Sequence, residues 1–252
     1  MNRMYVLYAN IINEIQKIFV QRKAKGFLIF TLMTPIVIAG ALNYAQKLLG
    51  FNILSETDYS FLLLDWFTSM ILPLFIFMVA SDLFVGEVSA RTLKLTLVRP
   101  ISRLKVYVSK LIAIGIFILI QLGVMWLSSI IVGSLVFHEW SLREFFQVWV
   151  GYALDFIPMF TLGVFAVLIG QFFSSTSGAF ALCTVLFVIA KIAVIFFPSL
   201  NAFLFTSFTD WHSLWIENYT PGSNLIDITL VILSSLILFF SIGYYKFDIK
   251  EV

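Results

Sequence analysis

The chain has 252 residues, of which 61% are hydrophobic and only 12% charged, and its mean hydropathy is +1.00. Soluble domains are roughly 45–50% apolar and about 25% charged, so this composition excludes an ordinary soluble domain and predicts an all-α membrane protein. The net charge of +2 gives no sign of a nucleic-acid partner, and the positions of the charges are more informative than their sum.

Residues 1–26 predict an amphipathic helix ahead of the first membrane span. Its apolar residues recur at three- and four-residue spacing and are Leu7, Ile11, Ile12, Ile15, Ile18 and Phe19. The other face carries Asn10, Asn13, Glu14, Gln16, Lys17 and Gln21. We expect this helix to lie on the cytoplasmic membrane surface, with its cationic end attracted to anionic lipid. Packing against another protein helix is the alternative.

A helix needs about 20 apolar residues to cross a hydrocarbon core about 30 Å thick. Six stretches of one transmembrane domain, residues 1–252, meet this requirement: 27–49, 61–80, 106–137, 148–173, 179–200 and 225–245. The third stretch is longer than one crossing requires, so we expect its start to project into the cytoplasm as helix. The apolar-rich loops after the third and fifth spans predict short interfacial helices.

The lysines and arginines predict the orientation, since cytoplasmic loops are enriched in these residues. Thirteen of them fall in the N-terminal segment, in the stretch from Arg91 to Lys110, and in the C-terminal tail. The other side has Arg143, with Lys47 at the edge of a span. We therefore expect a multi-pass protein of the cell membrane with both termini in the cytoplasm.

The sequence contains none of the common catalytic or nucleotide-binding motifs, including the GxxxxGK[ST] phosphate loop, so we expect neither catalysis nor a bound cofactor. Cys183 is the only cysteine, which rules out an intrachain disulfide. The two histidines, His138 and His212, fall in separate outer loops, where we expect them to be solvated and not to bind metal.

Ionisable residues within spans are costly and mark packing or pathway sites. Asp65, Asp155 and Lys191 are the candidates for such intramembrane charges. Asp155 and Lys191 lie at similar depths, about 10 and 14 Å from the outer ends of their spans at 1.5 Å per residue. We expect them to form an ion pair that locks spans four and five together, with contact to the substrate as the alternative.

The loop of residues 82–105, between spans two and three, has an unusual composition for a loop in water. Glu87 and Arg91 have the spacing and order of a favourable helical pair, and the leucines that follow leave apolar surface that a partner would cover. Pro100 ends this element, and Ser102 is placed to cap the helix of the third span. The loop therefore predicts a short amphipathic helix that docks onto another protein.

This loop resembles the first cytoplasmic loop of ABC-2 type permeases. The matching residues are Glu87, Thr92, Leu93, Leu95, Leu97, Pro100, Ile101, Ser102, Arg103 and Lys110. Two positions depart from the pattern, since Arg91 and Ser109 stand where the family usually has glycine. The layout of an N-terminal helix, six spans and a sizeable segment between spans five and six is also similar to that family.

The resemblance implies a permease subunit of an ATP-binding cassette exporter, with a coupling helix that sits in a groove of a separate ATPase. The residues it assigns to ATPase coupling are Glu87, Arg91, Thr92, Leu93, Leu95, Leu97, Arg99, Pro100, Ser102, Arg103 and Lys110. It further implies two ATPase subunits, which bind ATP and Mg, and a second permease subunit in a homo- or heterodimer. The alternatives are an ATP-independent secondary transporter and a non-transporting membrane scaffold or immunity protein.

Overall fold

The computed structural model describes residues 3–49, 56–89, 102–137, 142–216 and 222–249. Within these ranges the chain is helical almost throughout and has no strand, which confirms the predicted all-α class. The α-helices are α1 Arg3–Val20, α2 Arg22–Leu49, α3 Glu56–Trp66, α4 Leu72–Ser89, α6 Arg103–Phe137, α7 Leu142–Leu154, α8 Phe156–Gly170, α9 Thr176–Phe196, α10 Trp211–Ile216 and α11 Gly222–Asp248.

Six helical segments of the described chain are long and apolar enough to cross a membrane, as predicted. They are Arg22–Leu48, Thr57–Glu87, Arg103–Val136, Arg143–Gly170, Thr176–Phe196 and Leu225–Asp248. The third is one continuous helix of 35 residues, so its predicted extra length is confirmed. The fifth ends before the predicted residue 200 because Pro198 opens a short 3-10 helix, Pro198–Ala202.

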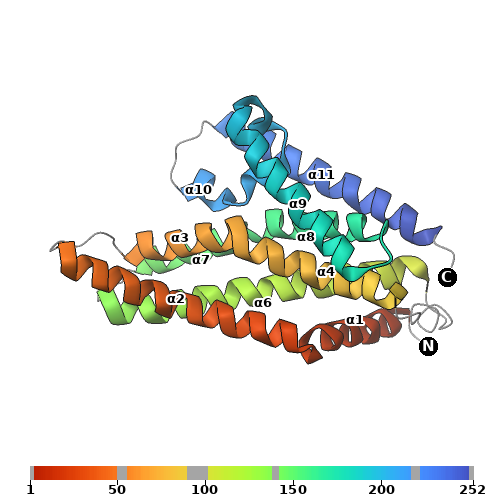
Figure 1. Ribbon diagram of the computed structural model, residues 1–252, viewed down its shortest axis with the longest axis horizontal. Helices are drawn as coiled ribbons and strands as arrows, with labels where there is room; N and C mark the ends of the chain where they lie inside the picture. Colours follow the sequence, from red (N-terminus) through yellow and green to blue (C-terminus); the bar gives the residue numbers. More distant parts are fainter. Residues whose placement is uncertain (1–2, 50–55, 90–101, 138–141, 217–221, 250–252) are drawn as a thin grey trace.

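The helices form an elongated bundle, with α9 and α11 along one side of it (Figure 1). α8 packs against α4 and α11, and α6 packs against α1 and α2. α1 begins, α4 ends, α6 begins and α11 ends at one end of the molecule, which carries most of the described lysines and arginines. We call this the basic end, and the other the opposite end, where α3 and α7 begin and α10 lies.

Two of the spans are interrupted at prolines, which lack the N–H that an α-helix needs at interior positions. In span two the π-helix Phe67–Ile71 separates α3 from α4, directly ahead of Pro73, and the N–H of Leu72 bonds to the carbonyl of Phe67. In span four Asp155 separates α7 from α8, three residues ahead of the buried Pro158. Pro35, in contrast, lies within the single helix α2.

Helix α1 packs lengthwise along the start of α6, so the alternative placement against protein helices is the observed one. Asn10 Nδ2 donates to Ser109 Oγ at 2.6 Å, and the rings of Phe19 and Phe117 lie 6.3 Å apart. Because the contacting positions rise together along both helices, α1 and α6 run parallel.

The predicted division of α1 into a polar, exposed face and an apolar, buried face is wrong. Asn10 and Glu14, assigned to the polar face, are buried together with Ile18, whereas the apolar Ile12 is 37% exposed. The pattern misled because it takes polarity as a sign of exposure, and here the polar side chains find partners on α6. Lying on a membrane surface stays a prediction for the exposed face of α1.

The end of α11 is attached to the bundle through the fully buried Tyr107 of α6. The Tyr107 ring packs against the rings of Phe84, Phe240 and Phe247, with centroids 5.5 to 5.7 Å apart. Its hydroxyl points at Gly243, where an added Cβ would lie 2.5 Å from Tyr107 Oη. Glycine at position 243 therefore allows α11 to approach α6 closely.

We expect Gly243→Ala to lower the thermal unfolding midpoint of the purified protein in detergent. Overpacking of this kind costs about 1–3 kcal/mol, which exceeds the gain of up to about 1 kcal/mol that alanine brings to a helix. Gly123→Ala in α6 is the matched control, since nothing lies within 4 Å of the Cβ it would add. A midpoint for Gly243→Ala equal to that of the control would show that Tyr107 moves aside freely.

Candidate functional site

Four charged side chains form a closed ring at the basic end. Lys17 Nζ lies 2.7 Å from Glu14 Oε1 and 2.7 Å from Glu87 Oε1. Lys110 Nζ lies 2.8 Å from Glu14 Oε2 and 2.8 Å from Glu87 Oε1. Each lysine therefore contacts both glutamates, and we call these four residues the charge ring.

Three helices supply the charge ring. Glu14 and Lys17 come from α1, Glu87 from the last turns of α4, and Lys110 from the second turn of α6. On α1 the two residues are three positions apart, which places them on one helix face. Asn10, on the same face, bonds to Ser109 beside Lys110 and fixes the position of α1 along α6.

Burial makes this pairing necessary. The side chains of Glu14 and Lys110 have no exposed surface, and that of Glu87 is 12% exposed. A buried charge without a partner costs several kcal/mol, and the ring offsets this cost because its four formal charges sum to zero. Lys110 also donates to the carbonyl of Leu83 at 3.1 Å, so its ammonium group has three protein acceptors.

Lys17 is the most exposed member of the charge ring, with 35% of its side chain accessible. Burial lowers the pKa of Lys17, but the hydrogen bonds to and charges of Glu14 and Glu87 outweigh it and raise the pKa above its ordinary value. Lys17 therefore stays charged at neutral pH.

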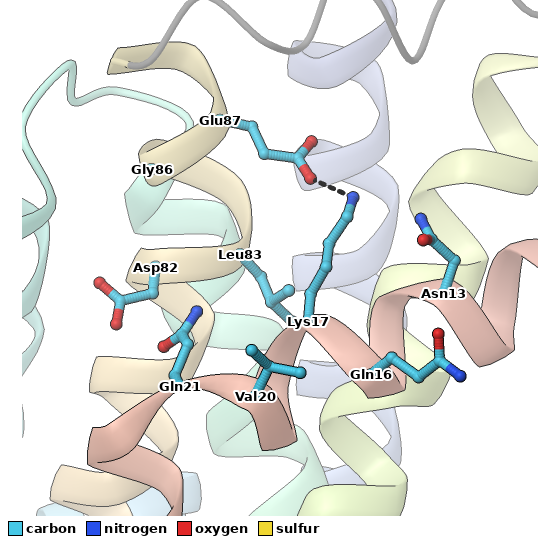
Figure 2. Close-up of a pocket in the computed structure, with 9 residues that line it drawn as sticks. All are labelled: Asn13, Gln16, Lys17, Val20, Gln21, Asp82, Leu83, Gly86 and Glu87. Carbon is cyan, nitrogen blue, oxygen red and sulfur yellow. Dashed lines mark hydrogen bonds and ion pairs between the residues drawn. The ribbon is translucent and has the colours of Figure 1, made fainter.

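A groove of about 430 Å³ opens beside the charge ring, between α1 and α4 (Figure 2). It is lined by Asn13, Gln16, Lys17, Val20, Gln21, Asp82, Leu83, Gly86 and Glu87. Lys17 and Glu87 point toward each other across it, as Figure 2 shows. The groove gives solvent access to one edge of the charge ring.

The charge ring flanks the segment that the sequence assigned to docking. Glu87 lies just before the end of α4 at Ser89, and α6 begins at Arg103, directly after Ser102, as predicted. The carbonyl of Ser102 accepts from the N–H groups of Lys105 and Val106. The predicted residues Arg91, Thr92, Leu93, Leu95, Leu97, Arg99 and Pro100 lie outside the described residues, and so does the predicted Glu87–Arg91 pair.

The predicted ion pair between Asp155 and Lys191 is wrong. Asp155 Oδ2 lies 2.8 Å from His212 Nδ1, and its Oδ1 accepts from the backbone N–H of His212 at 2.9 Å. Lys191 Nζ instead donates to Thr209 Oγ1 at 2.7 Å. Equal depth in two spans was not sufficient for contact, because the segment between α9 and α11 folds back and supplies both partners.

His212 brings together two of the predicted intramembrane charges. Its Nε2 lies 3.4 Å from Asp65 Oδ1, so the imidazole bridges Asp65 and Asp155. The prediction that His212 is a solvated loop residue is wrong, since only 2% of it is exposed. Among the described residues no group of His, Cys, Asp and Glu side chains is arranged to hold a metal ion.

Sequence reasoning missed the roles of Glu14 and Lys17. A signal was present, because Asn10, Glu14 and Lys17 share one face of α1 and repeat at helical spacing, as expected of a helix that pairs with polar residues of another. No signal identified His212, whose partners are distant in the sequence.

Six candidate membrane spans, with a polar centre at one end beside the segment that joins spans two and three, define a polytopic membrane protein. The chain belongs to the ABC-2 transporter family: the family model described as "ABC-2 family transporter protein" matches residues 5–252. The protein is therefore a permease-type transporter of a family whose members are transmembrane components, generally not catalytic themselves. No curated protein matches the chain.

We expect Lys110→Met to destabilise the protein by about 3–5 kcal/mol, because it leaves Glu14 buried with a single lysine. The double variant Glu14→Gln/Lys110→Met should recover part of this loss, since Lys17 and Glu87 then remain as a neutral pair. The measurement is the free energy of unfolding in mixed micelles. Lys23→Met is the control: its pair with Asp82 is 3.3 Å long with the lysine 54% exposed, so it should cost less than about 1 kcal/mol.

Proposed function

We propose that this chain is the permease subunit of an ATP-binding cassette exporter, driven by a separate ATPase that binds the segment of residues 90–101. The family membership supports a permease that works with an ATPase and forms dimers. The charge ring is the structural observation that carries the proposal, because it fastens both flanks of this segment to each other.

The charge ring would make the ends of α4 and α6 move as one unit. Glu87 and Lys110 are in direct contact, and Lys110 also holds the carbonyl of Leu83, one turn earlier in α4. A push on the segment between these helices is therefore transmitted to both spans and cannot be absorbed by separating them. Lys110 has no exposed surface, so it would act on the ATPase through Glu87 and not by direct contact.

Helix α1 would carry the same motion to a third span. Glu14 and Lys17 tie α1 to the charge ring, and α1 joins α2 through a bend at Gln21. Spans one, two and three would then respond together when the ATPase closes, as packed helices do in shear and rigid-body transitions. A side chain of the ATPase that enters the groove beside Lys17 would contact the charge ring directly.

The assembly would place both termini and the basic end in the cytoplasm of the cell, as the distribution of lysines and arginines predicts. ATP and Mg would bind to the two ATPase subunits, and a second permease subunit, identical or not, would complete the pathway. The mostly apolar interior favours an amphipathic or hydrophobic substrate.

The first test is purification of the chain from native membranes in mild detergent, with identification and assay of any ATPase that copurifies. We expect a stoichiometric ATPase, and we expect Leu93→Asp to release it while the chain itself remains monodisperse. A wild-type chain that purifies alone, although the preparation retains its fold, would contradict the proposal and favour a secondary transporter or scaffold.

A second variant separates docking from coupling. Glu87→Gln keeps a side chain of the same shape but weakens its contacts with Lys17 and Lys110. We expect the ATPase to remain bound, while the difference in ATP hydrolysis rate between the complex and the free ATPase falls by about 10-fold, the size of a typical coupling free energy. Lys23→Met, outside the charge ring, should leave this difference unchanged. An equal effect of both variants would exclude the charge ring as the coupling element.

A further inference from the structure

A second polar centre lies at the opposite end, away from the charge ring. His212 of α10 is held between Asp65 of α3 and Asp155, which separates α7 from α8. Its ring also stacks on Phe61, with centroids 5.3 Å apart and an interplanar angle of 15°. These contacts fasten the short helix α10 to spans two and four.

The geometry favours a doubly protonated imidazole. Nδ1 faces Asp155 Oδ2 at 2.8 Å, and Nε2 faces Asp65 Oδ1 at 3.4 Å. A neutral imidazole has one N–H and one lone pair, so one carboxylate would then face a lone pair. With both carboxylates ionised, only the imidazolium directs an N–H toward each of them: it donates to Asp155 and lies within ion-pair distance of Asp65.

The surrounding charges favour that form. Burial lowers the pKa of His212, but the hydrogen bond to Asp155 and the charges of Asp155, Asp65 and Asp210 outweigh it and raise the pKa above its ordinary value. Lys191 of α9 bonds to Thr209 and interacts with Asp210. The phenol of Tyr152 donates to the carbonyl of Ser60 at 3.2 Å.

We propose that His212 is a proton-binding site at the opposite end, and that the bound proton latches α10 onto span two. Loss of the proton opens the contact with Asp65, which is the longer of the two and has a carboxylate that is half exposed. The contact with Asp155 persists, because Nδ1–H and the backbone N–H still donate to its buried carboxylate.

Loss of the contact between His212 and Asp65 would act on span two next to its π-helix. Asp65 lies in the last turn of α3, directly ahead of the π-helix Phe67–Ile71, and π-helical turns often occur at functional sites within helices. Once the contact between His212 and Asp65 is broken, α3 loses its ionic tie to α10. The pH of the compartment at the opposite end would thus set how firmly α3 and α10 are joined.

The proton site is tested by nitrogen-15 NMR of histidine-labelled protein in micelles. His138→Gln leaves His212 as the single histidine, so its titration is read without overlap. We expect a pKa above 6.5, a neutral form protonated at Nδ1 in place of the usual Nε2, and a downward shift of the pKa in Asp65→Asn. A pKa at or below 6.5, or no shift in Asp65→Asn, would overturn the proposal.

The latch itself is tested by hydrogen–deuterium exchange of residues 211–216, corrected for the intrinsic pH dependence of exchange. The pKa of His212 is raised in the folded protein, so its stabilising contribution is complete below pH 6.5 and is lost as the pH rises through the raised value. We expect exchange to accelerate over that window in the wild type and to be fast at every pH in His212→Gln. Identical pH profiles for the two proteins would rule out a proton-controlled latch.

Discussion

Two lysines and two glutamates are buried at the basic end because each lysine contacts both glutamates. This mutual neutralisation determines how α1, α4 and α6 are placed. Without Glu14, Lys110 would retain a single carboxylate partner in a site with no access to water. Without Lys110, the two glutamates would share one lysine, itself partly exposed. The joint position of the two helices that flank residues 90–101 follows from this ring, and the ring together with the Asn10–Ser109 bond sets the register of α1 on α6.

Span two connects the two polar centres of the protein. Glu87 near one of its ends belongs to the charge ring, and Asp65 in its other half contacts His212. Between them, the π-helix and Pro73 interrupt regular α-helical hydrogen bonding. A span fixed by charges at both ends and irregular between them has a defined place at which to bend. The proposed drive from the ATPase and the proposed proton latch would act on the same helix from opposite ends.

The remaining spans differ in how much of their surface the chain itself covers. In the apolar stretch of span six only 6% of the residues are buried within the protein, and in that of span five 17%. The corresponding shares are 56% in span three and 61% in span four. The outward faces of α9 and α11 therefore require lipid or another chain against them. The proposed second permease subunit would have ample apolar surface there, whereas α6 and α8 already form the core of the single chain.

The sequence by itself determined the all-α class, the number of spans and the start of α6, because these depend on local composition and on helix-breaking residues such as Pro100. It also predicts that the segment flanked by Glu87 and Lys110 docks onto a partner, which stays a prediction. Only the tertiary structure decided which charges pair. Glu14 and Lys110 are 96 positions apart, and Asp155 and His212 are 57 apart. Whether a charge meets water, lipid or an opposite charge depends on how helices distant in sequence pack, which no local pattern records.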